Sequence, residues 1–360
     1  MTHIQASSIV FDARDCDNCR TKRISHPHIL IISNHRAVQK EYPASGIFVI
    51  RQVTSLRKLG LKISRYDLGG SHSPIHFFKN WLRLRHKIRQ LRPDIVHAQY
   101  GTIQAMLAVL TGSPTVVSFC GGDLIRAAPS VSPMRAHLGF LMSNLAALRA
   151  GGIICKSEEL RQALWWKRSE AVVIPSGVDL DIFTPGPQDD AREELGWEIG
   201  PPIVFFSSGG DEKNKGLDIV QRAMEVVCNQ IPNAQLQTIS HNIHPRRMPL
   251  YFRAADVLVC ASKREGSPNV VKEALACNLP VVSTPVGDVR ERLKGVYPSA
   301  IVPREPKAFG EAVARILLER QRSNGREHVQ ELALDRVAMR VKHCYERVMG
   351  NMEGRITSAI

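Results

Sequence analysis

The chain has 360 residues, of which 44% are hydrophobic and 23% charged, a composition that excludes a disordered or fibrous protein. This length exceeds what one hydrophobic core usually spans, so we expect two domains of roughly 150–200 residues each. The formal net charge is +14, with 24 lysines and arginines against 12 acidic residues in residues 1–185 and 24 against 22 in residues 186–360, so the first half attracts nucleic acid, anionic lipid or phosphorylated ligands without selecting among them.

The first 25 residues lack the apolar core of a secretory signal, and no stretch of the chain reaches the ~20 apolar residues of a membrane-spanning helix. Of eight cysteines, only Cys16 and Cys19 have the spacing of metal ligands, and no second pair completes four ligands. We therefore expect reduced thiols, no metal site and a cytoplasmic protein that at most rests on the inner face of a membrane.

Short apolar runs alternate with longer amphipathic segments, which is typical of βαβ units around a mostly parallel sheet. In the first half this pattern predicts a helix over residues 48–59, ended by Gly60. It predicts strands over residues 28–33, 94–98, 115–119, 152–155 and 171–174. The first half therefore reads as one α/β domain.

Residues 77–92 carry six lysines and arginines and no acid. Phe77, Trp81, Leu84, Ile88 and Leu91 fall on one face at helical spacing. The simpler interpretation is the core face of a helix with solvated cations outside, and a basic helix lying on anionic lipid is compatible with it.

A turn-rich stretch near residues 185–200 marks a domain boundary, after which the alternation restarts. The pattern predicts strands over residues 203–206, 234–239, 257–260 and 280–283, helices over 217–229 and 269–277, and a final helix over 322–349. The second half thus reads as another doubly wound α/β domain, and ligands of such sheets bind at the carboxyl ends of the strands.

The segment EGSPNVVKE directly follows the predicted strand 257–260. Ser267 is suited to the N-cap of a helix and Pro268 to its first position. Such a helix start aims its free N–H groups at the carboxyl edge of the sheet, which suits a diphosphate. Gly266 allows a ligand to approach the backbone closely.

Two glutamates bracket this helix start. Glu265 lies in the loop before the helix, and Glu273 lies about two turns into it, where a carboxylate can accept hydrogen bonds from a ribose diol. The alternative is that both are surface carboxylates beside a well-capped helix, since their spacing alone is common.

Residues 256–288 closely resemble the retaining glycosyltransferases of family 4, also called group 1, whose hallmark is EGxPxxxxEAxAxGxPVV. Here Asn278 stands where the family usually has Gly, and Asn also tolerates a positive φ. Residues 93–97 resemble the family's PDVVH strand, residues 174–179 its IPNGVD segment, and residues 43–47 its glycine-bearing loop after the first strand. The resemblance spans about residues 28–349.

The resemblance implies the GT-B fold, which has two Rossmann-like doubly wound domains with an interdomain cleft. Residues 1–185 would form the acceptor-side domain, residues 186–335 the nucleotide-sugar-binding domain, and residues 336–360 a C-terminal helix and tail. The implied activity is the retaining transfer of a sugar from a nucleotide-sugar to a polysaccharide or lipid-linked glycan, with no cofactor and no divalent metal.

The resemblance also assigns roles to single residues. Glu265 would contact the transferred sugar and Lys215 would support the leaving diphosphate, where an ammonium offsets developing charge. The implied donor-binding residues are Gly46, Gly266, Ser267, Pro268, Asn269, Val270 and Glu273, the last of them at the nucleotide ribose.

Two positions depart from the family pattern. The family has an arginine about six residues before the position of Lys215; none occurs here, and Lys213 is a substitute without the bidentate fork. Cys120 stands in FCGGD where the family's FHGSD has a histidine near the reacting sugar, while Asp123 remains. We assign Cys120, Asp123 and Lys213 to the acceptor side or the cleft.

These departures leave open a second class, a GT-B protein that binds sugar nucleotides with little or no transfer. An epimerase on the same fold lacks this glutamate segment, and a nicotinamide dehydrogenase is disfavoured because no GxGxxG follows the first strand. Nucleic-acid binding is suggested by charge alone, without a basic-aromatic module, so we expect none.

Overall fold

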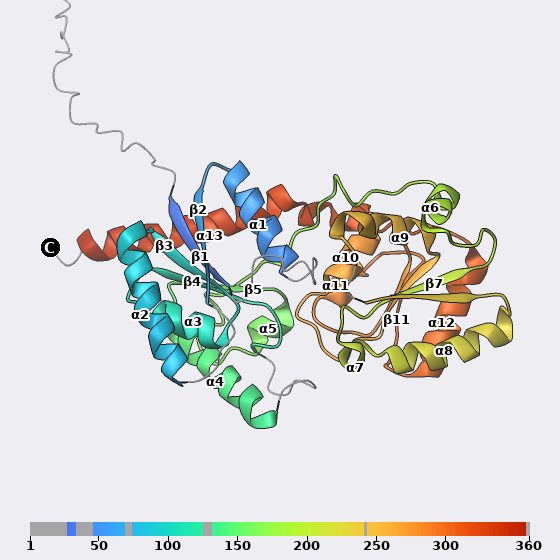
Figure 1. Cartoon of the computed structure of the whole chain (residues 1–360), viewed down its shortest axis with the longest axis horizontal. Helices are drawn as coiled ribbons and strands as arrows, with labels where there is room; N and C mark the ends of the chain where they lie inside the picture. The colour runs from blue at the N-terminus through green and yellow to red at the C-terminus, as the bar shows by residue number, and fades with distance from the viewer. Residues whose placement is uncertain (1–26, 34–45, 69–73, 125–131, 241–242, 358–360) are drawn as a thin grey trace, which may run out of the picture.

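The computed structural model describes residues 27–33, 46–68, 74–124, 132–240 and 243–357. They form two α/β domains that lie side by side, each with a sheet between helices (Figure 1). Cys16 and Cys19 lie outside the described residues, and the six cysteines within them are free thiols.

The first domain is built on a six-stranded sheet in the order β2-β1-β3-β4-β5-β6, with every neighbouring pair parallel. Its strands are β1 (His28–Ser33), β2 (Lys62–Asp67), β3 (Ile95–Gln99), β4 (Thr115–Phe119), β5 (Gly152–Cys155) and β6 (Val172–Val173). The predicted bounds of β1, β4 and β5 are confirmed. Strand order reverses between β1 and β3, which opens a crevice at the carboxyl ends of these strands.

Helices cover both faces of this sheet. They are α1 (Ile47–Lys58), α2 (Pro74–Leu91), α3 (Thr102–Val109), α4 (Pro133–Arg149) and the short α5 (Glu158–Gln162). Helices α2, α3 and α4 pack on one face around Leu84, Leu107 and Phe140. The predicted apolar stripe of α2 lies against this core, which confirms the simpler interpretation of residues 77–92.

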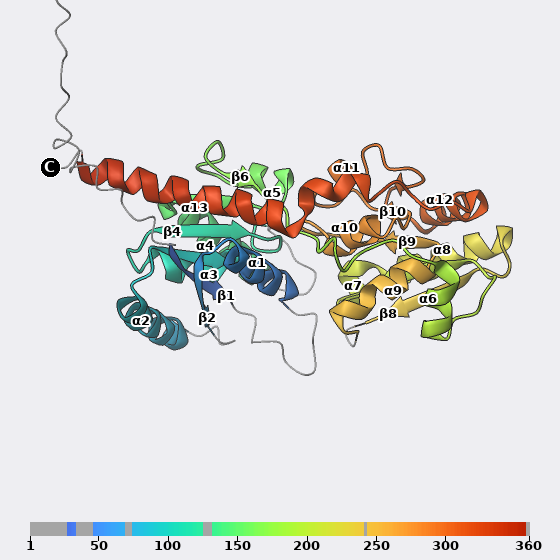
Figure 2. The ribbon, with the colours of Figure 1, turned by 90° about the horizontal axis from the view of Figure 1, so that it is seen from above.

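The other face is covered by α1 together with the last helix, α13 (Leu334–Thr357), which returns from the second domain and lies along the first (Figure 2). A buried contact fixes it: the Tyr345 hydroxyl lies 2.6 Å from His97 Nδ1, and His97 Nε2 lies 2.8 Å from the Ser118 hydroxyl. Burial lowers the pKa of His97 to about 3, so the ring stays neutral.

Two expectations about this end of the chain change. The predicted helix start at residue 322 is wrong, because α13 begins at Leu334 after a 3-10 segment, η2 (Glu327–Leu332). Residues from Val337 to Val348 complete the core of the first domain instead of forming a separate C-terminal unit.

The second domain has a five-stranded parallel sheet in the order β11-β10-β9-β7-β8. Its strands are β7 (Ile203–Ser207), β8 (Gln235–Ile239), β9 (Val257–Cys260), β10 (Val281–Ser283) and β11 (Ala300–Ile301). The predicted bounds of β9 are confirmed. The order reverses between β7 and β9, so the ligand crevice of this sheet also lies at strand carboxyl ends.

Helices α8 (Leu217–Gln230) and α12 (Pro306–Glu319) cover one face of this sheet, and α9 (Met248–Ala254) and α10 (Asn269–Ala276) cover the other. The remaining elements are α6 (Gln188–Leu195), α7 (Glu212–Lys215), η1 (Pro245–Arg247) and α11 (Val289–Arg292).

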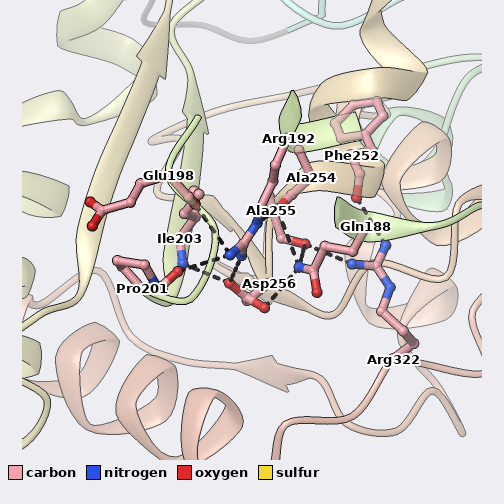
Figure 3. A network of polar contacts seen from close by, with 10 residues as sticks. All are labelled: Gln188, Arg192, Glu198, Pro201, Ile203, Phe252, Ala254, Ala255, Asp256 and Arg322. Atoms are coloured by element: carbon pink, nitrogen blue, oxygen red, sulfur yellow. Dashed lines mark hydrogen bonds and ion pairs between the residues drawn. The ribbon is translucent and has the colours of Figure 1, made fainter. Parts of the chain in front are cut away.

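A polar network fastens α6 to the amino-terminal ends of β7 and β9 in the second sheet (Figure 3). Arg192 donates to Asp256 Oδ2 at 2.8 Å, to the Ala254 carbonyl at 2.9 Å and to the Pro201 carbonyl at 3.1 Å. Asp256 Oδ2 also accepts from the backbone N–H of Ile203 at 2.6 Å, directly at the start of β7. The network therefore sets where the domain begins.

We expect Arg192→Met to lower the free energy of unfolding of the second domain by about 2 kcal/mol, because it removes the buried donor of the Ala254 and Pro201 carbonyls and the partner of Asp256, whose side chain is 29% exposed. The side chain of Arg192 is 4% exposed. Urea unfolding followed by tryptophan fluorescence measures the change. Arg222→Met on exposed α8 surface is the matched control, and equal midpoints for the two variants would contradict the expectation.

Candidate functional site

A cavity of about 680 Å³ lies between the two domains. The first domain contributes Arg51 from α1 and, after strands β4 and β5, Cys120 and Lys156. The second domain contributes Lys215, Glu265, Gly266, Ser267, Pro268, Asn269, Val270 and Glu273. The carboxyl ends of both sheets thus meet in one cleft, where their topology places ligands.

Helix α10 begins at this cavity at Asn269, as the predicted range 269–277 has it, but its N-cap differs from the predicted one. Its N-cap is Pro268, in extended conformation, and no side chain caps its first N–H groups. Ser267 is therefore not the N-cap. Its hydroxyl accepts a hydrogen bond from Lys272 Nζ at 2.8 Å. The uncapped start leaves backbone donors and the positive end of the helix dipole at the cavity wall, which suits an anion.

Glu265 and Lys215 form a close pair in the cavity. Lys215 Nζ lies 2.5 Å from Glu265 Oε1, and the Ser262 hydroxyl donates to the same oxygen at 3.0 Å. Burial acts to lower the pKa of Lys215, and the carboxylate of Glu265 outweighs it, so that the pKa is raised and the ammonium stays charged. A fixed positive charge beside a carboxylate is thus available to a ligand.

Glu273 is held by a residue that the sequence analysis missed. Arg51 Nη1, from α1 of the first domain, lies 2.5 Å from Glu273 Oε1, and both side chains are 11% exposed. The Arg51 guanidinium also stacks over the Phe183 ring at 5.2 Å. An arginine in an amphipathic helix gives no local signal of a partner 222 residues away.

The two domains also touch through backbone. An ideal Cβ built on Gly266 would lie 2.0 Å from the carbonyl oxygen of Cys120 and 2.9 Å from Gly121 Cα. Nearby, Glu159 Oε2 accepts a hydrogen bond from the Gly287 N–H at 3.1 Å. The loop after β4 therefore presses directly on the loop before α10.

Two further predicted residues, Gly46 and Cys120, lie at or beside the cavity. Gly46 is the left-handed N-cap of α1, with φ 71°, and directly precedes the cavity-lining Ile47. Residues 43–45 of its predicted loop lie outside the described part of the chain. Cys120 lines the cavity, and burial raises the pKa of its thiol to about 12, so it stays protonated.

Two assignments to the cleft need correction. Asp123 is completely buried and accepts hydrogen bonds from the backbone N–H groups of Gly101, Cys120 and Gly121, so it shapes the loop beneath the cavity and does not line it. Lys213 is exposed and outside the cavity wall. It lies on α7, whose turn directs Lys215 to the cavity instead.

The described residues lack the features of a metal site and of a membrane-spanning helix. No group of three or more histidine, cysteine, aspartate or glutamate side chains there is arranged to hold a metal ion. Among the helices of those residues, none combines the length and the apolar character needed to cross a membrane.

A segment of each domain matches the model of a known protein family. Residues 31–182 match the family model of Glycosyltransferase Family 4, and residues 239–319 match that of Glycosyl transferases group 1. A D-inositol 3-phosphate glycosyltransferase of Xylanimonas cellulosilytica is 30% identical over 41% of this chain and 43% of its own length. TuaC of Bacillus subtilis, a candidate teichuronic acid glycosyltransferase, is 26% identical over 64% of this chain and 62% of its own. The matched region thus spans about two fifths to three fifths of the length of these relatives.

Solved structures share the fold over about nine tenths of the chain. Sucrose-phosphate synthase of Thermosynechococcus elongatus superposes with a TM-score of 0.70 at 19% identity, covering 90% of this chain and 100% of that one. HepE of Anabaena in complex with UDP-glucose gives 0.62 at 15% identity, covering 91% and 100%. The fold is therefore GT-B, as expected, and a segment of each domain matches a glycosyltransferase family model.

Proposed function

We propose that the protein is a retaining glycosyltransferase that moves a sugar from a nucleotide-sugar to a glycan or lipid-linked acceptor. The observation that supports this best is the single cavity in which Glu265, Lys215 and the uncapped start of α10 meet. The solved structures of HepE hold UDP, glucose or UDP-glucose, and the curated relatives are named for glycosyl transfer.

In this proposal the donor lies along the second domain. The ribose binds at Glu273, which exchanges part of its contact with Arg51 for the ribose hydroxyls. The diphosphate lies at the first N–H groups of α10 and beside Lys215, and the sugar lies at Glu265. No metal ion takes part, because the helix start and the ammonium supply the positive charge.

The reaction breaks the bond between the anomeric carbon and the diphosphate oxygen, which leaves with the electron pair. The acceptor hydroxyl attacks the same face of the sugar and passes its proton to the departing diphosphate oxygen, so the anomeric configuration is retained. Lys215 offsets the charge that develops on the departing phosphate, and such preorganised charge is usually a large contribution to catalysis. The Cys120 thiol takes no proton in this scheme.

The test is a thermal-shift screen over UDP-, GDP- and ADP-sugars followed by a transfer assay with the donor that binds. A donor that raises the melting temperature by mass action and is turned over, with loss of turnover in Glu265→Gln, supports the proposal. Binding without turnover against a panel of glycan and lipid acceptors favours the alternative, a sugar-nucleotide-binding protein. NMR of the product reports the anomeric configuration.

The first domain also presents apolar side chains to solvent beside its cations. On α2, Ile75, Phe78 and Leu82 are exposed by 67%, 57% and 47% and follow helical spacing. Met134 and Leu138 are exposed near the start of α4. Apolar side chains on a basic helix favour binding at an anionic lipid surface. We propose that this surface rests on the cytoplasmic face of a membrane that carries the acceptor.

We expect the protein to pellet with anionic phosphatidylglycerol vesicles at low salt and to be released at high salt, because the cations drive the encounter. The variant Phe78→Ser, which removes an exposed apolar side chain, is expected to bind the vesicles several-fold more weakly, with Leu318→Ser on distant α12 as the control. Absence from the pellet at low salt would exclude this surface as a membrane contact.

A further inference from the structure

Lys156 is a buried cation at the cavity between the domains. It directly follows β5, is 2% exposed and lines the cavity wall. Its ammonium has no hydrogen-bond partner among the described residues. Of the cationic residues of this cavity wall, Arg51 is paired with Glu273 and Lys215 with Glu265.

An unpaired buried ammonium is costly in the free protein, because burial removes its hydration and no carboxylate compensates. Two groups that act on it electrostatically, Cys120 and Asp123, do not serve as hydrogen-bond partners. The Cys120 thiol stays protonated, as its raised pKa of about 12 shows. The Asp123 carboxylate is occupied by backbone N–H groups. Burial lowers the pKa of Lys156, which agrees with an ammonium that lacks an anion.

The position of Lys156 indicates which end of a ligand it would meet. β4 and β5 are neighbours in the sheet, with Phe119 paired to Cys155, so Cys120 and Lys156 follow at the same edge. The carbonyl of Cys120 in turn lies against Gly266, at the end of the cavity that holds Glu265 and the start of α10. The ribose end lies further along α10, where Glu273 pairs with Arg51 of α1.

We propose that Lys156 is a substrate-binding residue of the first domain that pairs with an oxyanion of the bound nucleotide-sugar, at its diphosphate or at a carboxylate of an acidic sugar. The inference deepens the proposed function and rests on it. It gives the first domain a charged contact with the donor, so that binding of the anion joins the two domains across the cavity.

Isothermal titration of wild type and Lys156→Met with UDP, UDP-glucose and UDP-glucuronate, with GDP and ADP alongside, tests the inference. Loss of a charge-assisted contact is expected to weaken binding about ten- to hundredfold. Equal weakening for all ligands assigns Lys156 to the diphosphate, and weakening for UDP-glucuronate alone assigns it to the sugar carboxylate. Lys307→Met, which removes an exposed lysine on α12, is the control and is expected to bind like wild type.

The melting temperature without ligand separates a binding role from a structural one. Because Lys156→Met removes an uncompensated charge, the free variant is expected to melt at or above the wild-type temperature. Unchanged affinity in Lys156→Met would overturn the inference and leave the proposed function intact, whereas a wild type that binds none of these nucleotides would overturn both. A lower melting temperature of Lys156→Met would indicate a structural role and count against the inference. If the Met variant does not fold, Lys156→Gln, which keeps a polar end group, supplies the same binding comparison.

Discussion

Lys215→Met is expected to lower kcat for sugar transfer by about two to three orders of magnitude, the usual effect of removing one charged or polar group that stabilises a transition state. The ammonium lies 2.5 Å from Glu265 Oε1 at the cavity wall. In the proposed reaction, its charge stabilises the negative charge that the departing diphosphate gains. KM for the donor is expected to change less than kcat, since the start of α10 still binds the phosphates.

Steady-state kinetics with the donor identified by the thermal-shift screen measures this effect. Lys213→Met is the informative comparison, because the sequence suggested Lys213 as a phosphate-binding substitute while the structure shows it exposed on α7 and outside the cavity. We expect that variant to stay within about twofold of wild type. Equal losses in the two variants would mean that general positive charge matters rather than the position of Lys215.

The sequence predicts best those strands that are buried on both faces. β1, β4, β5 and β9 are short apolar runs in which every residue except Gly152 is buried. Because such strands are apolar on both faces, a hydrophobic run in the sequence is enough to predict them. β2 escaped prediction because it is an edge strand that mixes charged and apolar residues, with only Ile63 buried. Its pairing with β1 depends on the tertiary fold, so the composition of the segment alone does not predict it.

The amphipathic pattern of α13 indicates a buried face but not its partner. The helix follows the second domain in sequence, yet its apolar side packs on α1 and the first sheet, because the uncovered face of that sheet needs a helix. The order of the chain predicted a separate C-terminal unit over residues 336–360, whereas the packing makes α13 part of the core of the first domain.

The candidate site likewise has one part that the sequence predicts and one part that only the fold brings together. Residues 265–273 are contiguous, so a local motif located the start of α10 and both glutamates at the cavity. Arg51 and Lys156 enter the site from other elements, where nothing in their own segments marks them. The N-cap was misplaced by one residue because Pro268 adopts an extended conformation before Asn269, while the Ser267 hydroxyl is engaged by Lys272.

Gly266→Ala is expected to reduce kcat/KM about a hundredfold while the melting temperature changes little. The added methyl carbon would lie 2.0 Å from the Cys120 carbonyl oxygen, closer than any real contact, and both neighbours are backbone that cannot rotate away. The least costly response is a small separation of the two domains at this point. A displacement of about 1 Å between catalytic groups costs on the order of a hundredfold in rate.

The clash acts across the cleft rather than within either core, so each domain should fold normally and separation should be the main consequence. Gly350→Ala, at a helical glycine with no neighbour within 4 Å of the new methyl, is the matched control and should retain full activity. Small-angle scattering of the unliganded proteins reports whether the variant is more open. Wild-type kcat/KM in Gly266→Ala would mean that this backbone contact loosens freely before reaction, and that the catalytic arrangement does not require Cys120 and Gly266 to meet.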